Sequence, residues 1–325
     1  MDFVSCSSIY KSLKSNKYDI VHVHNMLPMF ILSTFRKTID SKVVFTFHNT
    51  PDPPNRILGY FKNFFLDKSF AEFIIKNNNY DLLIPGSKFY YDWAVKLGAN
   101  PEKTKLIYMG IEKEVFDSKL RQNKAMYRKK IGLPSSDFIV TFPSRIIRRK
   151  GIFELINAFS LLKKSGCNNI KLFLPASFSP FDSGCYEEIS HLIKKLGLDG
   201  IILKPNKLFS YYDMPMVYGA SDLVVMPSYY EGLGLAALES MSMGIPVIAT
   251  NVVGLNEIFE NNKNGLLIKR QSVEELYTAI KTIYINPKLY HRLSMGGKQT
   301  INNKFEIKNQ VNKLEKVYTQ LINEQ

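Results

Sequence analysis

The sequence contains 325 residues, of which 45% are hydrophobic and 22% are charged, a composition typical of an ordinary globular protein. It has no apolar stretch near the roughly 18 residues of a membrane-spanning helix, and residues 1–17 lack the apolar core and cleavage site of a secretory signal. The net charge of +14 favours an anionic partner, whether nucleic acid, a phospholipid surface or a phosphorylated ligand, although a lysine-rich solvated surface accounts for it equally well.

The three cysteines, Cys6, Cys167 and Cys185, form neither a CxxC pair nor a disulfide-type array. Such cysteine usage is typical of a reducing compartment. We therefore expect three small packing residues in a cytoplasmic protein.

Short apolar, β-branched runs alternate with amphipathic segments along almost the whole chain. The runs that indicate buried parallel strands are residues 20–24, 43–48, 82–85, 105–108, 138–144, 171–175, 201–204, 223–227, 246–249 and 265–268. The helical patterns lie at residues 153–165, 185–196, 235–243 and 273–285. This repetition predicts parallel sheets with helices on both faces.

The alternation restarts after a polar, charged stretch at residues 117–130, which we interpret as a linker. We therefore predict a first, Rossmann-like domain at residues 1–125, a second domain at residues 126–303, and a helix at residues 304–325 that packs back on the first domain. The first domain opens without the strand and Gly-rich turn that normally begin a doubly wound sheet. We expect it to be incomplete.

Two strand patterns in the first half end in histidines, at His22 and His24 and at His48. In a parallel sheet these positions lie at the ligand-facing edge. A histidine at a strand end is nevertheless more often structural, which we expect of His24 and above all of His22. The following segment, residues 56–76, mixes aromatic and aliphatic residues with lysine. It fits either a membrane interface or an ordinary helix packed on the sheet.

In the second half, the strand pattern at residues 138–144 ends in a basic loop, RIIRRKG. Cations at the carboxyl end of a strand can neutralise a diphosphate and stabilise the charge that grows on it as a glycosidic bond breaks. A run of charges is usually a solvated face, and we expect this of Arg148 and Arg149. Arg145 and Lys150 are the candidates for the site.

The densest pattern follows the strand at residues 223–227. A loop with Glu231, Gly232 and Gly234 leads into a helix that carries Glu239. Such a turn offers free backbone N–H groups and a helix dipole to a diphosphate. Eight helical residues span roughly 12 Å, so two carboxylates can hold hydroxyls at both ends of a nucleotide sugar. Alternatively, Glu231 is only a charge at the helix N-terminus and Glu239 only a solvated helix residue. The uncharged residues that flank Glu239 disfavour this alternative.

These patterns resemble the retaining glycosyltransferases of the GT4 family. The similar segments are the E-x7-E element of Glu231 and Glu239, the R-x4-K-G element of Arg145 and Lys150, and the strings GIPVIATNVVGLNEIFENNKNGLLI and MGIEKEVF. The resemblance covers nearly all of the chain and is most specific at residues 143–268. It implies an α/β protein of the GT-B fold, with two Rossmann-like, doubly wound parallel-sheet domains that face a cleft.

As the resemblance implies, Arg145 and Lys150 bind the donor diphosphate, Glu231 binds the transferred hexose and Glu239 binds the ribose. His48 faces the transferred sugar, which makes it a catalytic candidate together with Glu231, Arg145 and Lys150. The backbone amides expected at the distal phosphate are those of Leu233, Gly234 and Leu235. Members of the family typically use no metal, and we expect no cofactor and no metal here.

The predicted activity is therefore retaining transfer of a hexose-type sugar from a UDP- or GDP-linked donor to an acceptor hydroxyl. The expected acceptor is a glycan or a lipid-linked molecule in cell-surface polysaccharide, lipopolysaccharide or glycolipid synthesis. The protein is expected in the cytoplasm, with an anionic membrane surface as a candidate partner. A catalytically silent nucleotide-sugar-binding subunit and a GT-B epimerase or inverting transferase remain alternatives. No helix-turn-helix, RRM or zinc-knuckle pattern supports a nucleic-acid partner.

Overall fold

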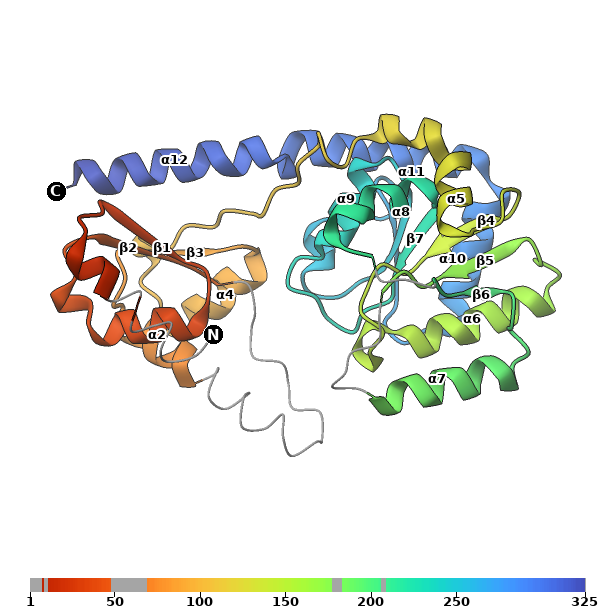
Figure 1. The fold of residues 1–325 in the computed structure, drawn as a ribbon, viewed down its shortest axis with the longest axis horizontal. Helices are drawn as coiled ribbons and strands as arrows, with labels where there is room; N and C mark the ends of the chain where they lie inside the picture. The colour runs from red at the N-terminus through yellow and green to blue at the C-terminus, as the bar shows by residue number, and fades with distance from the viewer. Residues whose placement is uncertain (1–7, 9–10, 48–68, 177–182, 206–208, 325) are drawn as a thin grey trace. The chain divides into compact units, whose positions relative to one another are not determined.

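The computed structural model describes residues 8, 11–47, 69–176, 183–205 and 209–324. The chain divides into two compact units, the first made of Met1–Met109 with Lys308–Gln325 and the second of Gly110–Ile307 (Figure 1). Each unit is an α/β structure built on a parallel sheet.

The first unit holds a three-stranded parallel sheet in the order β1-β2-β3. Its strands are β1 (Ile20–Val23), β2 (Lys42–Phe47) and β3 (Leu82–Pro85). Its helices include α2 (Met26–Thr34), α4 (Lys88–Lys96) and α12 (Ile307–Asn323), with short 3-10 turns η1 (Arg36–Thr38) and η2 (Pro101–Lys103). Ser87 begins α4 by accepting a hydrogen bond from the Tyr90 amide, which satisfies one of the free amides of the first turn.

Alternate residues of these strands face two different layers, as the two-residue period of a strand requires. On one face Val43 and Phe45 pack with side chains of α2 and α4. On the other face Val44 lies among side chains that include Val317 and Leu321 of α12, the blue helix in Figure 1. The last helix therefore supplies one of the two layers that cover this sheet.

The second unit holds a six-stranded parallel sheet in the order β6-β5-β4-β7-β8-β9. Its strands are β4 (Phe138–Thr141), β5 (Ile170–Phe173), β6 (Ile202–Leu203), β7 (Leu223–Met226), β8 (Val247–Thr250) and β9 (Leu266–Ile268). The chain builds the sheet outward from β4 in one direction and then from β7 in the other. This is the order of a doubly wound Rossmann sheet.

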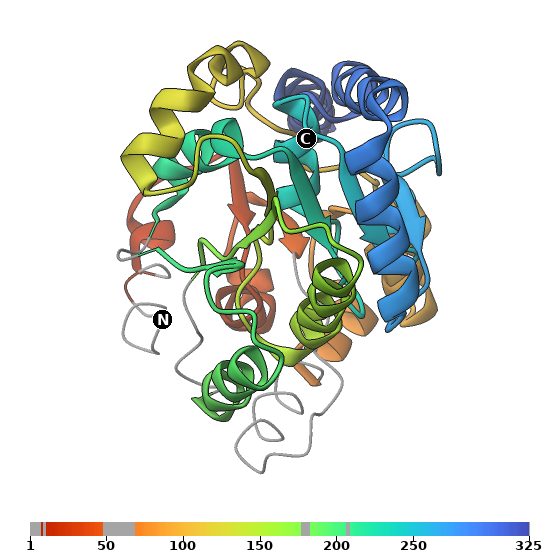
Figure 2. The same ribbon diagram turned by 90° about the vertical axis from the view of Figure 1, so that its right-hand side faces the viewer.

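Helices cover both faces of this second sheet. The helices are α5 (Lys124–Ile131), α6 (Ile152–Lys164), α7 (Ser183–Lys195), α8 (Met214–Ala220), α9 (Leu235–Ser242), α10 (Val273–Ile285) and α11 (Pro287–Thr300). The shorter turns are η3 (Ser118–Asn123), η4 (Arg148–Lys150), η6 (Tyr211–Asp213), η7 (Leu255–Glu257) and the π-helical η8 (Ile301–Phe305). Figure 2 shows α6 and α10 side by side against the strands. Val140 packs in the core with them, while its neighbour Ile139 packs with α8 on the opposite face.

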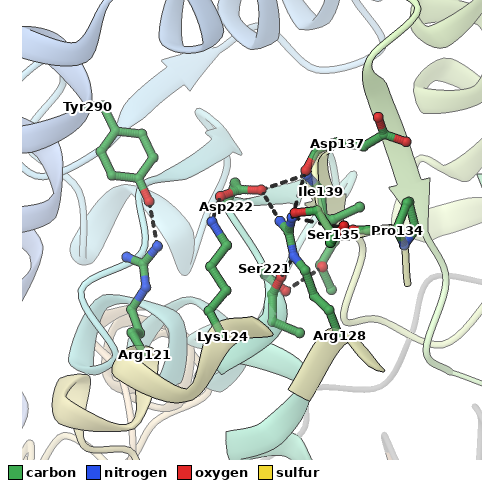
Figure 3. A network of polar contacts seen from close by, with 12 residues as sticks. Arg121, Lys124, Arg128, Pro134, Ser135, Asp137, Ile139, Ser221, Asp222 and Tyr290 are labelled. Carbon is green, nitrogen blue, oxygen red and sulfur yellow. Dashed lines mark hydrogen bonds and ion pairs between the residues drawn. The ribbon is translucent and has the colours of Figure 1, made fainter. Parts of the chain in front are cut away.

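The charged segment at residues 117–130 is not a linker, contrary to the prediction. It forms η3 and most of α5, and it lies within the second unit, which begins at Gly110 rather than near residue 126. The reason is a buried polar network around Asp222, which accepts hydrogen bonds from Arg128 (2.5 Å) and Lys124 (Figure 3). Basic residues that the sequence pattern predicted to be solvated thus donate hydrogen bonds to a buried carboxylate.

The remaining boundaries agree with the predicted ones to within a few residues, with one exception. Residues 105–108 form no strand; the Lys105 and Ile107 amides donate to the carbonyls of Leu83 and Pro85 and so follow β3 without a ladder of their own. Among the residues that the structure describes, no helix is both long and apolar enough to traverse a bilayer.

The amphipathic segment at residues 56–76 is described from residue 69 onward, and residues 69–77 are helical. Ala71, Ile74 and Ile75 are buried there, and the ring of Phe70 stacks on that of Phe30 at 4.2 Å. For this part of the segment the first unit covers most apolar side chains, while Phe73 is 38% exposed.

Candidate functional site

The candidate site lies where two neighbouring strands of the second sheet, β4 and β7, end. The chain leaves β4 toward one edge of the sheet and β7 toward the other. In an open parallel sheet, ligands bind outside the carboxyl ends of the strands at such a switch point. The basic loop follows β4 and the loop with the two glutamates follows β7, so both predicted motifs meet here.

Lys150 and Glu231 lie in contact across this switch point. The Lys150 Nζ donates to Glu231 Oε1 at 2.5 Å, and the two side chains are only 12% and 10% exposed. The Ser228 hydroxyl donates to the same carboxylate oxygen at 2.7 Å. The pair is 81 residues apart in sequence, and it joins the two loops.

One glycine allows these two loops to approach so closely, and a second allows the loop after β8 to approach Glu231. Gly151, directly after Lys150, has φ +76, and a side chain there would place its Cβ 2.1 Å from the Pro227 carbonyl oxygen. Gly254 has φ +85, and its Cβ would lie 2.4 Å from the Glu231 carbonyl oxygen. Both positions need the left-handed backbone that glycine adopts without strain. A side chain at either position would collide with a backbone carbonyl, so the position of Glu231 requires glycine at both.

Burial lowers the pKa of Lys150, although the charge of Glu231 and the hydrogen bond to it oppose the shift. The positive charges of Arg149 and Arg145 lower it further. Arg145 is exposed and lies close enough to Lys150 to act on it electrostatically. The loop is therefore a concentrated positive region that an anionic ligand would stabilise.

Glu239 lies on α9 and accepts a hydrogen bond of 2.6 Å from the hydroxyl of Tyr218, a fully buried residue of α8. Burial raises the pKa of Glu239, while the bond from Tyr218 opposes that shift. Burial also raises the pKa of Tyr211, followed by the nearby charge of Glu239. Glu239 is thus held by the protein and not solvated, as the uncharged flanks predicted.

The α9 helix begins directly after Gly234, which has φ +90 and provides no side-chain cap. Leu233 is buried, and a Cβ on Gly234 would lie 2.6 Å from a methyl group of Leu255. The predicted amides of Leu233, Gly234 and Leu235 therefore lie at an uncapped helix start, where backbone N–H groups remain free for a ligand.

His48 lies outside the described residues, so its predicted role remains a prediction. His22 has a structural position, because one ring nitrogen contacts the Tyr318 hydroxyl of α12 at 2.5 Å and the other the Thr46 hydroxyl at 2.8 Å. Of the two arginines expected on a solvated face, Arg148 is exposed and pairs with Glu188, while the Arg149 guanidinium lies over the ring of Tyr230.

The family described as glycosyl transferases group 1 matches residues 123–300, more than half of the chain, and the glycosyltransferase family 4 description matches residues 1–115. The chain belongs to the glycosyl transferases group 1. The switch-point loops with Lys150, Glu231 and Glu239 all lie within the first match.

Curated relatives are also glycosyltransferases. The chain is 29% identical over 263 residues to an uncharacterised glycosyltransferase of Methanocaldococcus jannaschii, which covers 78% of this chain and 63% of the relative. The chain thus spans less than two thirds of that protein. It is 26% identical over 329 residues to the UDP-Gal:alpha-D-GlcNAc-diphosphoundecaprenol alpha-1,3-galactosyltransferase of Escherichia coli, which covers 99% of this chain and 80% of the relative.

Among solved structures, Anabaena HepE in complex with UDP matches with a TM-score of 0.81 and 19% identity, over 97% of this chain and 82% of that one. At this identity the match establishes the fold, which is GT-B. The predicted fold class and family are therefore confirmed.

Two contributors to this candidate site were not predicted from the sequence. Ser228 could have been found, because it is three residues before Glu231 in the same loop and carries a hydroxyl. Tyr218 carries no such signal, since it lies on another helix, 21 residues before Glu239, within an apolar stretch. Only the tertiary structure brings this α8 side chain to Glu239 of α9.

Proposed function

We propose that the protein transfers a sugar from a nucleotide diphosphate sugar to an acceptor hydroxyl. The observation that carries the proposal is the contact of Lys150 with Glu231 at the switch point after β4 and β7. A buried cation can neutralise a diphosphate leaving group, and a carboxylate next to it can accept hydrogen bonds from sugar hydroxyls. Both groups are already held within reach of one ligand.

The donor is a UDP-linked hexose on this proposal, with a GDP-linked hexose as the alternative. The name of the Escherichia coli relative specifies UDP-Gal, and HepE was solved with UDP. In this assignment Arg145 and Lys150 bind the diphosphate, the start of α9 binds its distal phosphate, and Glu239 binds the ribose. No metal is required, because the cations of the β4 loop balance the phosphate charge.

The proposed reaction retains the anomeric configuration. The bond from the sugar C1 to the diphosphate oxygen breaks, and the acceptor oxygen bonds to C1 from the same face. The acceptor proton passes to the departing phosphate oxygen. The protein's contribution is to position both substrates and to stabilise the leaving group, with His48 against the transferred sugar.

The proposed acceptor is a lipid-linked glycan at the cytoplasmic face of a membrane. The name of the Escherichia coli relative describes an acceptor linked to diphosphoundecaprenol, and a relative from Staphylococcus aureus is named for capsular polysaccharide biosynthesis. The net charge of +14 supports contact with an anionic surface.

The test is a thermal-shift screen of the full chain against UDP-, GDP- and ADP-sugars, because a ligand that binds the native state raises its melting temperature. We expect the largest rise with a UDP- or GDP-sugar. The sugar donor that binds is then incubated with a lipid-linked acceptor, and the anomer of the product is determined. The proposal would be refuted if no nucleotide sugar raised the melting temperature. Binding without transfer would identify a catalytically silent subunit. Release of an altered sugar in the absence of acceptor would identify an epimerase.

A further inference from the structure

The β7–α9 loop that carries Glu231 is held by its own tyrosine, Tyr229. The Tyr229 hydroxyl donates to Glu154 Oε1 at 2.6 Å, and the Tyr229 amide donates to the Arg149 carbonyl at 2.8 Å. One residue thus ties the loop both to the backbone beside Lys150 and to α6. These contacts lie two residues before Glu231.

The other end of the bond, Glu154, is a rigid anchor. It lies in the first turn of α6, where its neighbours Ile152, Leu155 and Ile156 are fully buried in the core. Its second carboxylate oxygen, Oε2, is buried and has no hydrogen-bond partner among the described residues. Burying a carboxylate oxygen without a partner is costly.

Tyr229 can only donate to this carboxylate at physiological pH. Burial raises the pKa of Tyr229 to about 12, and the hydrogen bond to Glu154 and its charge add to that shift. The hydroxyl therefore keeps its proton, and the bond to the carboxylate is charge-assisted and strong.

The loop is held from the opposite side as well. The Thr250 hydroxyl donates to the Ser228 carbonyl at 2.5 Å, and the Glu231 amide donates to the Val253 carbonyl at 3.3 Å. Thr250 ends β8, so the loop after β7 is fixed to both neighbours of that strand in the sheet. Tyr229 supplies the contact on the β4 side, where Lys150 lies.

We propose that Tyr229 is a positioning residue: through Glu154 and the Arg149 carbonyl, it holds Glu231 at the distance from Lys150 at which both contact one nucleotide diphosphate sugar. The inference rests on the proposed function. On this proposal the position of Glu231 relative to Lys150 depends on the hydrogen bond between Tyr229 and Glu154 of α6, and neither side chain binds the ligand itself. Sites of this kind depend on supporting contacts that lock the groups that bind.

The test compares Tyr229→Phe, Glu154→Leu and Glu154→Gln in the full chain, with titrations of UDP and of GDP followed by calorimetry. Loss of one such hydrogen bond should weaken nucleotide affinity roughly 3- to 10-fold. The Tyr229→Phe and Glu154→Leu effects should not add, because both remove the bond between the two side chains, although Tyr229→Phe also removes the interaction of the hydroxyl with Gln271. Glu154→Gln keeps an acceptor oxygen and should restore most of the affinity. Tyr277→Phe, which removes a hydroxyl bonded to Lys281 on α10, is the matched control and should leave affinity unchanged.

A second measurement needs no ligand and separates this proposal from the proposed function. Hydrogen exchange at the amides of residues 228–235 should accelerate in Tyr229→Phe and in Glu154→Leu but not in Glu154→Gln or Tyr277→Phe. If the wild type binds neither nucleotide, the proposed function fails while the exchange result still decides the role of Tyr229. Unchanged exchange in Tyr229→Phe, or additive effects of the two substitutions, would overturn the positioning role.

Discussion

Buried cations lie at both ends of the strands of the second sheet: at the amino edge, where the strands begin, and at the carboxyl edge, where they end. The two cations differ in how many hydrogen bonds the protein accepts from them. At the amino edge, next to the start of β7, Arg128 is 4% exposed and donates to Asp222 and to the carbonyls of Ser135, Asp137 and Ala220. At the carboxyl edge, Lys150 is also nearly buried but has one hydrogen-bond partner among the described residues, Glu231. The protein thus accepts hydrogen bonds from every nitrogen of the Arg128 guanidinium, whereas the described part of the chain accepts one from the Lys150 ammonium.

The difference distinguishes a cation that several protein acceptors hold from a cation that keeps donors for a ligand. A buried guanidinium whose three nitrogens all donate to the protein holds segments together, as Arg128 holds α5 against the sheet. A buried ammonium has three donors, and one used donor leaves others for an incoming anion. The lowered pKa of Lys150 reflects the same shortage, because burial is compensated only in part by Glu231.

The largest expected effect is on stability at the amino edge. Arg128→Met should lower the free energy of unfolding by about 3–5 kcal/mol, because removal of one partner leaves a buried charge and several carbonyls without donors. Urea denaturation measures it, and Lys129→Met, an exposed neighbour on α5, should change it by no more than about 0.5 kcal/mol. A loss below about 1 kcal/mol in Arg128→Met would contradict the structural role.

At the carboxyl edge, Lys150→Ala should act on turnover more than on folding. We expect sugar transfer to fall about 10²- to 10³-fold, the usual result of removing a group that stabilises transition-state charge. The unfolding free energy should fall less than in Arg128→Met, since burial already disfavours the charged lysine. Transfer assays with Lys164→Ala, at the exposed end of α6, provide the control, and near-normal rates in Lys150→Ala would remove this residue from the site.

Gly151 and Gly132 allow a matched test of the close approach between the loops. Both have left-handed backbones, with φ +76 and +73, but a Cβ on Gly132 has nothing within 4 Å, whereas one on Gly151 meets the Pro227 carbonyl oxygen at 2.1 Å. Gly132→Ala should cost about 1–2 kcal/mol of stability from backbone strain alone. Gly151→Ala should cost about 1–3 kcal/mol more from overpacking and should weaken nucleotide binding. Equal losses in the two variants would show that the loops can separate freely.

The smallest expected effect is a dependence on pH from Glu239. Because burial raises its pKa above the ordinary 4.5 in the folded protein, its contribution to stability is present below pH 4.5 and is lost as the pH rises through the raised value. Nucleotide affinity should rise over the same interval, since the ionised carboxylate accepts both ribose hydroxyls. Melting temperatures measured against pH, with and without UDP, follow both.

Two variants sharpen this pH test. Tyr218→Phe removes the hydrogen bond that lowers the pKa of Glu239, so both transitions should move to higher pH. Glu239→Gln should abolish them. The assignment would be refuted if Glu239→Gln kept the pH dependence of the wild type.

The sequence predicted the strands and helices from local pattern, but not the order of the strands in the sheets. Continuous apolar runs placed the strands, because a strand buried on both faces has no polar side to interrupt it. The helical pattern at residues 273–285 matches α10 to the residue, and in the structure Ser272 caps its first turn. The run at residues 105–108 failed, since an apolar segment can lie along a strand edge without pairing fully. The glycines and charges of the two switch-point loops marked the site through their spacing after each strand.

The sequence by itself therefore determined the alternation of strands and helices, the family, and the pairing of a basic loop with a glutamate loop. Only the tertiary structure decided which charges serve folding. Arg128 and Lys150 look alike in the sequence, each within a cluster of basic residues, because charge type and spacing do not specify what lies across the sheet. The contacts of Lys150 with Glu231, 81 positions apart, and of Arg128 with Asp222, 94 positions apart, decide which cation belongs to the candidate ligand site and which one is structural.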